Sequence, residues 1–101
     1  MKSLRVLPEA EEELAAAAEW YEGKRAGLGV KLVAVVDGAF DEILEAPLAH
    51  PSWRTDRPYR WKVLTRFPYV VFFRLDGDAV EIMAVAHARR RPGYWLRRAH
   101  P

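Results

Sequence analysis

The residues best suited to chemistry lie near the end of the chain, in the run His87-Ala88-Arg89-Arg90-Arg91-Pro92-Gly93-Tyr94-Trp95. A cluster of guanidinium groups suits the capture of an anionic surface, because arginine stays charged and presents several N–H donors. Three adjacent arginines in extended or irregular backbone cannot all point into one buried site, so we expect at least one to face solvent or a partner. Pro92-Gly93 predicts a turn, after which Tyr94 and Trp95 fold back against a sheet.

A second group of cations lies on the strand predicted from Tyr59 to Arg66. The two-residue period of a strand gives it two faces. One face carries Tyr59, Trp61, Val63 and Thr65, and the other carries Arg60, Lys62, Leu64 and Arg66. We expect the aromatic face to pack and the basic face to be exposed. Exposed cations can contact phosphates, but charges on an exposed strand face are also ordinary in antiparallel sheets, so both interpretations stay open.

The charges are distributed unevenly between the two halves of the chain. The net charge is +2, yet residues 1–53 hold five Lys and Arg against ten Asp and Glu, whereas residues 54–101 hold eleven against four. The halves therefore carry −5 and +7. This asymmetry favours an acidic or polyanionic partner for the second half, although basic residues that merely solvate exposed strands would give the same count.

Length and composition set limits on the class of protein. A chain of 101 residues that is half hydrophobic fits one domain, which we expect to span residues 1–101. It has no cysteine and three scattered histidines, so we expect neither a metal site nor a cofactor. No apolar run approaches the roughly 20 residues of a membrane span, and the first residues lack the apolar core of a signal peptide. We expect a soluble, cytoplasmic protein.

Patterning predicts an α+β fold. Ser3 to Leu7 can form a strand, which Pro8 ends; Pro8 and the glutamates after it start a helix that stops near Gly23. Apolar residues at helical spacing predict a second helix from about Leu28 to Glu45, antiparallel to the first. A loop follows, and then three antiparallel strands form a meander over residues 59–66, 69–75 and 79–86.

Two features of the helices have alternative explanations. Glutamates 9, 11, 12 and 13 resemble a catalytic carboxylate cluster, but we interpret them as residues that complement the helix dipole and are solvated. Gly38 lies in the middle of the second helix at a cost of about 1 kcal/mol relative to alanine. This cost is tolerable if a neighbouring element approaches closely there. In the loop before the meander, Trp53 is expected to cover the edge of the core.

Taken together, these residues resemble the RelE/ParE superfamily, the bacterial toxins of type II toxin–antitoxin systems that are often labelled plasmid stabilisation proteins. The resemblance rests on the order of the elements, on Phe67-Pro68-Tyr69 at the start of the central strand, and on His87-Ala88-Arg89-Arg90 at the end of the last strand. It covers nearly the whole chain and implies the fold described above, an N-terminal strand, a helical hairpin and a three-stranded meander.

The His-x-Arg-Arg motif followed by Pro-Gly-Tyr-Trp is more similar to the ParE branch. That similarity implies a toxin that is not an enzyme, that inhibits DNA gyrase by binding, and that a cognate antitoxin neutralises in a hetero-oligomer. It also makes His87 a strand-end residue that bonds a loop rather than a general base. The residues expected to contact the target are Arg60, Arg66, Arg89, Arg90, Arg91, Tyr94 and Trp95.

The RelE branch implies a different activity, ribosome-dependent cleavage of mRNA. This endoribonuclease chemistry needs cations around a crowded phosphate and groups that move protons. The matching residues are Lys62, Arg66, Arg89 and Tyr94. A third hypothesis is a small basic nucleic-acid-binding domain, which ranks last because no helix suited to reading a groove is evident.

Overall fold

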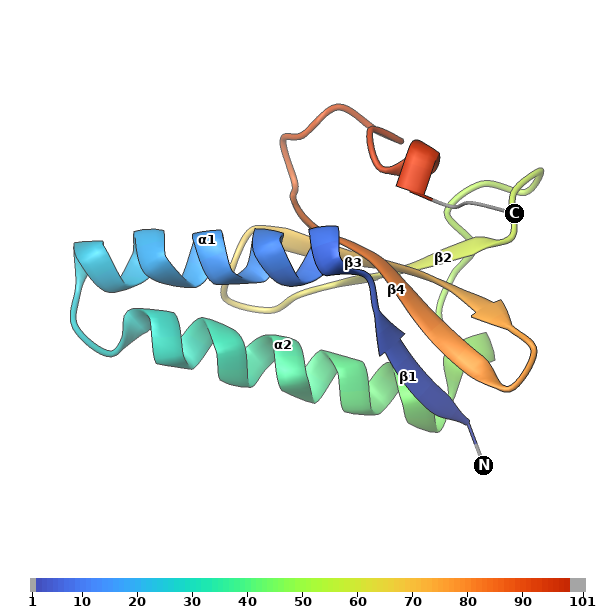
Figure 1. Cartoon of the computed structure of the whole chain (residues 1–101), viewed down its shortest axis with the longest axis horizontal. Helices are drawn as coiled ribbons and strands as arrows, with labels where there is room; N and C mark the ends of the chain where they lie inside the picture. The colour runs from blue at the N-terminus through green and yellow to red at the C-terminus, as the bar shows by residue number, and fades with distance from the viewer. Residues whose placement is uncertain (1, 99–101) are drawn as a thin grey trace.

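The computed structural model describes residues 2–98. Its elements, in chain order, are β1 (Ser3–Val6), α1 (Pro8–Lys24), α2 (Leu28–Glu45), the 3-10 helix η1 (Pro47–Ala49), β2 (Tyr59–Val63), β3 (Tyr69–Asp76), β4 (Ala79–His87) and the 3-10 helix η2 (Leu96–Arg98). Figure 1 shows α1 and α2 side by side on the left and the labelled strands on the right, with the loop after β4 at the top. The predicted α+β class, with a helical hairpin and a meander, is confirmed.

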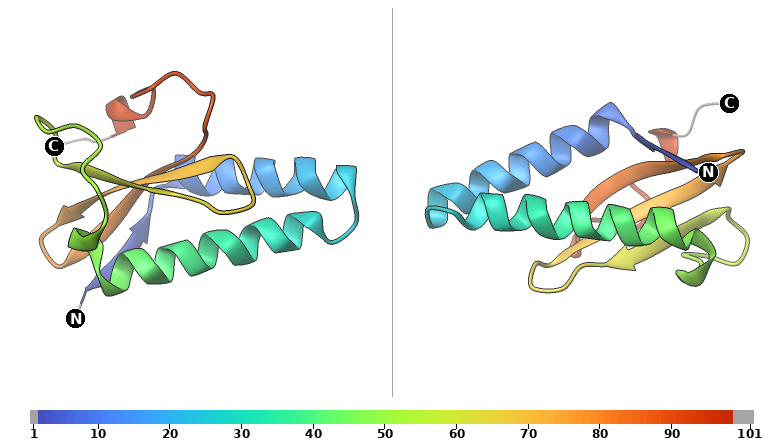
Figure 2. Two further views of the ribbon diagram at one scale, coloured as in Figure 1. Left: turned by 180° about the vertical axis from the view of Figure 1, so that it is seen from behind. Right: turned by 90° about the horizontal axis from the view of Figure 1, so that it is seen from below.

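The sheet has the strand order β1-β4-β3-β2. Strands β2, β3 and β4 pair antiparallel as the predicted meander, and β1 adds to it by pairing parallel with β4. The N-terminal strand therefore lies beside the last strand, which leaves β1 and β2 as the two edges. In the right-hand view of Figure 2 both helices lie on one side of the sheet.

The helices begin and end close to the predicted residues. Pro8 opens α1 and the bounds of α2 are those predicted, but α1 continues through Gly23 to Lys24. The connector turns at Gly27, whose φ is +87°. The Glu22 carboxylate accepts the Gly27 and Gly29 N–H groups at 2.7 and 3.0 Å, and these bonds lower its pKa. No helix among residues 2–98 has the length and apolar character needed to cross a membrane.

The close approach between the helices occurs at Gly29 rather than at Gly38. A Cβ added to Gly29 would lie 2.3 Å from the Ala18 carbonyl oxygen on α1, whereas one at Gly38 would meet nothing within 4 Å. Within residues 2–98, therefore, no neighbouring element approaches Gly38 closely enough to explain a glycine there. Gly29 is the residue whose missing side chain lets the two helices pack together.

Each face of the sheet has its own core. On the helix side, apolar residues of α2 such as Leu32, Val36 and Ile43 belong to the same cluster as Val71 and Phe73 of β3. The other face, called here the open face, carries a second cluster. Its buried members are Tyr59, Val70, Phe72, Met83, Ala84, Ala86 and Trp95. Strand β3 is thus covered on both faces, as its nearly continuous apolar sequence predicts.

The predicted exposed basic face of β2 is wrong. Arg60 and Lys62 pair with Phe73 and Val71, so they lie on the helix side, because directly opposed residues of neighbouring strands share a face. Lys62 Nζ lies 2.6 Å from Glu42 Oε2, and Arg60 donates to the His50 carbonyl at 2.5 Å. At the edge of a sheet, such long side chains cover apolar surface with their stems and place their charges at the rim.

The end of this strand also differs from the prediction. β2 ends at Val63, which is 62% exposed, and Leu64 beyond it is buried. Leu64 still lies on the helix side, as the alternation predicts, but the strand ends three residues earlier than predicted. Arg66 does not lie on a strand but in the following turn, with a φ of +71°.

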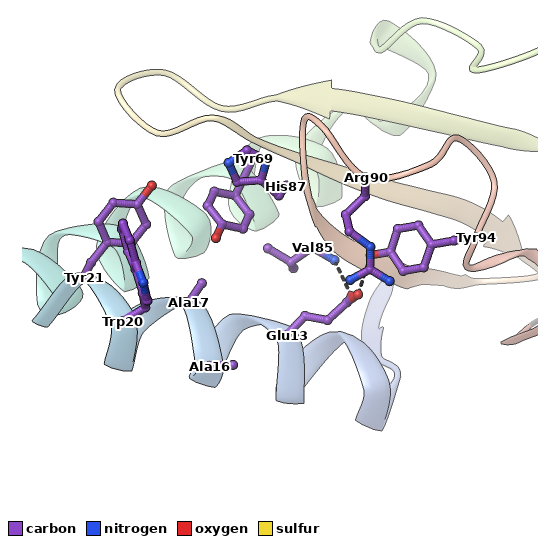
Figure 3. A pocket seen from close by; sticks show the side chains of 10 residues that line it. All are labelled: Glu13, Ala16, Ala17, Trp20, Tyr21, Tyr69, Val85, His87, Arg90 and Tyr94. Carbon is purple, nitrogen blue, oxygen red and sulfur yellow. Dashed lines mark hydrogen bonds between the residues drawn. The ribbon is translucent and has the colours of Figure 1, made fainter. Parts of the chain in front are cut away.

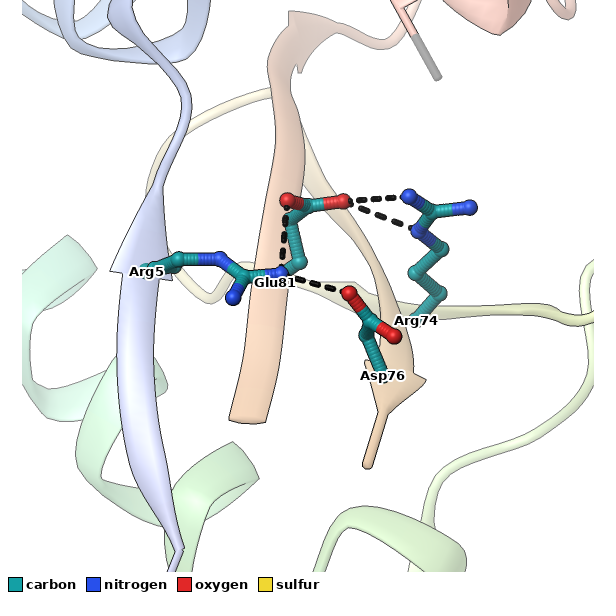
Figure 4. Close-up of polar contacts among 4 residues, drawn as sticks. All are labelled: Arg5, Arg74, Asp76 and Glu81. Atoms are coloured by element: carbon teal, nitrogen blue, oxygen red, sulfur yellow. Dashed lines mark hydrogen bonds and ion pairs between the residues drawn. The ribbon is translucent and has the colours of Figure 1, made fainter. Parts of the chain in front are cut away.

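An ion-pair network on β1, β4 and β3 attaches the N-terminal strand to the meander (Figure 4). Glu81 of β4 lies opposite Arg5 on one side and Arg74 on the other. It accepts hydrogen bonds from Arg5 at 3.1 Å and from Arg74 at 2.8 Å, and Arg5 also bonds Asp76 at 2.7 Å. The buried Glu81 is therefore compensated by a cation on each neighbouring strand, as buried charges need to be.

Candidate functional site

The topology brings two arginine-bearing turns to the same end of the sheet. Tyr69, at the start of β3, pairs with His87, at the end of β4, and the Ala88 N–H donates to the Pro68 carbonyl at 2.8 Å. Arg66 lies in the turn before β3, and the loop after β4 carries Arg89, Arg90 and Arg91, all exposed. We call these four residues the arginine end.

The arginine end is not neutralised by carboxylates in the described part of the chain. The ion pairs among residues 2–98 involve Arg5, Arg57, Lys62, Arg74 and Arg98, and none reaches the four arginines within 4.0 Å. Arg90 instead lies over the ring of Tyr94, 3.9 Å from its centre. Stacking of this kind holds a guanidinium in place while leaving N–H groups free for an anion.

His87 fixes the start of the loop that carries these arginines. Its Nδ1 accepts the Arg89 N–H at 3.1 Å, so the neutral ring carries its proton on Nε2. The ring also meets the edge of Tyr69, with centroids 5.2 Å apart. This geometry is that of a strand-end residue bonding a loop.

Glu13 connects three distant segments, and the interpretation of it as a solvated helix-start residue is wrong. The Glu13 carboxylate accepts the backbone N–H of Val85 at 3.1 Å and the hydroxyl of Tyr94 (Figure 3). Both terminal nitrogens of Arg98 donate to it as well, at 2.8 and 3.0 Å. Arg98 donates in addition to the Met83 carbonyl at 3.1 Å. A single carboxylate therefore ties the C-terminal segment to α1 and β4.

A pattern in the sequence pointed to this role. Ala10, Glu13 and Ala17 recur at intervals of three and four residues, which places them on one face of a helix, and both alanines are buried. A carboxylate on the buried stripe of a helix needs partners. The run of neighbouring glutamates concealed this pattern.

Tyr94 and Trp95 fold back as predicted, but onto different surfaces. Trp95 is fully buried on the open face, where its ring centre lies 4.7 Å from that of Tyr59 and 4.8 Å from that of Phe72. Tyr94 reaches toward α1 and Glu13 instead. Burial, together with the hydrogen bond to Glu13, raises the pKa of the Tyr94 hydroxyl well above its usual value. Trp95 therefore anchors the loop, while Tyr94 supports Arg90.

Two cavities adjoin this segment. A cleft of about 420 Å³ opens between α1 and the end of β4, lined by Ala16, Ala17 and Trp20 on the helix (Figure 3). A hollow of about 100 Å³ lies on the open face. His87, Arg90 and Tyr94 line both, so the stacked Arg90 borders an apolar recess on each side of the sheet.

The four residues expected of a ribonuclease lie in three different settings. Lys62 is on the helix side of β2 and paired with Glu42, and Tyr94 is bonded to Glu13. Arg66 and Arg89 lie at the arginine end. Within residues 2–98 no group of three histidine, aspartate or glutamate side chains is arranged to hold a metal ion. Of the four, Arg66 and Arg89 are the ones that the pairing of β3 with β4 brings to the same end of the sheet.

Comparison with known proteins gives a consistent result. The family model described as "ParE toxin of type II toxin-antitoxin system, parDE" matches residues 4–92. The fold is similar to a solved chain titled "Chromosomal ParDE TA system from P. aeruginosa", with a TM-score of 0.78 and 19% sequence identity. That alignment covers 86% of this chain and 96% of the other. A search of curated proteins gave no match.

Proposed function

The chain belongs to the ParE toxin family of type II toxin–antitoxin systems, and we propose that it acts by binding DNA gyrase through its arginine end and inhibiting it. The observation that carries this proposal is that Arg66, Arg89 and Arg90 lie at the same end of the sheet, exposed, with no carboxylate within 4.0 Å among residues 2–98. In a protein with no binding role, carboxylates beside these arginines would increase stability, because like charges at one end of a domain repel each other.

The neutralising partner is an antitoxin with an acidic, amphipathic segment. The cleft beside α1 supports this choice, because Ala16, Ala17 and Trp20 provide apolar surface and Arg90 provides a cation at its border. Complementary charge speeds encounter and fixes orientation, while apolar contacts supply affinity. An antitoxin bound in this cleft would contact Arg90 and so cover part of the surface proposed for the target.

A supercoiling assay tests the target. Purified protein should block supercoiling by gyrase and leave mRNA intact on translating ribosomes. Arg89→Ala and Arg90→Ala should each raise the concentration for half inhibition by roughly tenfold, because each removes charge-assisted hydrogen bonds worth about 1.5 kcal/mol or more. Lys24→Ala, which removes a cation at the far tip of α1, is the matched control and should have no effect.

Two results would contradict the proposal. Gyrase that supercoils normally at saturating protein would exclude inhibition by binding. Cleaved mRNA on ribosomes, lost in Arg89→Ala, would support the RelE-type activity in its place. Co-purification with the product of the neighbouring reading frame, an acidic small protein in such systems, tests the antitoxin separately. That complex should weaken in Arg90→Ala and in Ala16→Arg, while Lys31→Ala, at an exposed position of α2, should leave it unchanged.

A further inference from the structure

The hollow on the open face is built from small residues among large aromatic ones. Ala86 and Ala88 line it together with Trp53, Trp61 and Phe72. Its volume of about 100 Å³ is far below the several hundred Å³ of a site for a drug-sized molecule, and corresponds to about three water molecules. The hollow therefore has room for about one ring, and Trp61, which lines it and is only partly buried, offers that ring an aromatic surface.

Two arginines stack on aromatic residues that border this hollow. The Arg54 guanidinium lies 4.4 Å from the ring centre of Trp53, and that of Arg90 lies 3.9 Å from the ring centre of Tyr94. Trp53 and Tyr94 both line the hollow, and they come from two separate segments of the chain. In the part of the chain that the structure describes, neither guanidinium pairs with a carboxylate. One of these cations, Arg90, therefore lines the recess itself, and the other, Arg54, stacks on a residue that lines it.

We propose that this hollow takes one base of a single-stranded nucleic acid, while Arg54 and Arg90 bind neighbouring phosphates. Proteins that bind single strands combine stacking aromatic side chains with cations that follow the backbone. An acidic peptide is the weaker candidate, because its charges lie on side chains rather than along its backbone, and because it needs no recess the size of one ring. This inference does not depend on gyrase as the target, since it concerns a nucleic-acid contact made by the chain itself.

Quenching of tryptophan fluorescence measures the binding directly, because Trp53, Trp61 and Trp95 all line the hollow. Oligothymidylate and oligouridylate are the probes, and the tighter of the two identifies DNA or RNA as the source of the strand. Ala88→Leu fills the hollow from an exposed position, so the fold should tolerate it. It should weaken binding roughly 5- to 140-fold, the loss expected for one stacked base. Ala16→Leu places the same side chain in the cleft and should change affinity less than about twofold.

The charge contribution is measured by salt dependence. Each phosphate contact adds about 0.7 to the slope of log affinity against log salt for a single strand, so Arg54→Gln and Arg90→Gln should each lower the slope by about that amount. Lys24→Gln is the control, because Lys24 also stacks on an aromatic ring, that of Trp20, but at the far tip of α1.

Three outcomes would overturn the proposal. Wild-type fluorescence that neither oligonucleotide quenches at low salt would exclude a strand-binding site. If heparin competed as well as an unlabelled oligonucleotide and Ala88→Leu left the affinity unchanged, the interaction would be non-specific charge attraction. The hollow would be assigned to a protein partner if an acidic peptide with an aromatic residue bound in place of the oligonucleotides and Ala88→Leu abolished that binding.

Discussion

Replacing Glu13 with alanine should be among the most destabilising single changes in this protein. The substitution leaves the Tyr94 hydroxyl and the Val85 N–H without their acceptor, and the Arg98 guanidinium with only the Met83 carbonyl. The side chains of Glu13 and Arg98 are each 17% exposed, so water compensates them poorly. Breaking a buried pair costs about 3–5 kcal/mol, and the residual exposure favours the lower end, about 3 kcal/mol. Domains of this size have a total stability of about 5–15 kcal/mol.

Urea denaturation followed by circular dichroism measures this loss. In thermal denaturation, a change of 3 kcal/mol corresponds to a fall in Tm of roughly 12–24 °C for a domain of this length. Glu13→Gln keeps a neutral acceptor and should lose about half as much. Glu12→Ala removes an exposed carboxylate from the same turn of α1 and should stay within about 0.5 kcal/mol of the wild type. If Glu13→Ala unfolds with the same midpoint as Glu12→Ala, Glu13 is not the connector inferred here.

Three further predictions follow from particular contacts. The pKa of Tyr94 is higher in the folded state than its ordinary value of 10.0. The folded state therefore keeps the proton above pH 10.0, and the free energy of unfolding should fall as the pH rises further. Denaturation of Tyr94→Phe over the same pH range should show a smaller fall, because the variant lacks this hydroxyl. Lys62→Met should change stability by less than about 1 kcal/mol, because its carboxylate partner Glu42 is largely exposed. The variant should still inhibit growth, and a folded variant that no longer does so would show that Lys62 is a functional residue. Gly29→Ala should destabilise the protein by about 1–3 kcal/mol, because the new Cβ clashes with a backbone oxygen of α1. Gly38→Ala should stabilise it by about 0.5–1 kcal/mol, because the added Cβ meets nothing. Equal thermal midpoints for the two variants would contradict this packing of the helices.

Local patterns in the chain were sufficient to predict most of the elements. The apolar stripe from Leu28 to Glu45 predicted the bounds of α2, because apolar residues at helical spacing repeat along that whole segment and stop at its ends. Pro8 marked the start of α1, and Asp76-Gly77-Asp78 marked the turn between the last two strands, where Gly77 has a φ of +60°. The motif residues of the central and last strands also led to the superfamily of the ParE toxins.

The candidate site was predicted less completely, since it depends on contacts between segments far apart in the chain. The cluster Arg89-Arg90-Arg91 was visible as a run, and its exposure agrees with the expectation that some of it faces outward. The pairing of β3 with β4 brings the turns that carry Arg66 and Arg89 to the same end of the sheet, which no local pattern reveals. Whether these residues contact a target stays a prediction.

What the sequence by itself determined is the set of elements, their class and the charge asymmetry, because propensity, periodicity and composition act over short distances. Tertiary structure alone decided which face of β2 meets the helices. A two-residue period divides the side chains of a strand into two sets but does not say which set is buried. It likewise decided that Glu13, one glutamate among four, receives the bonds that hold the C-terminal segment, because a carboxylate becomes a connector only where donors from other segments converge on it.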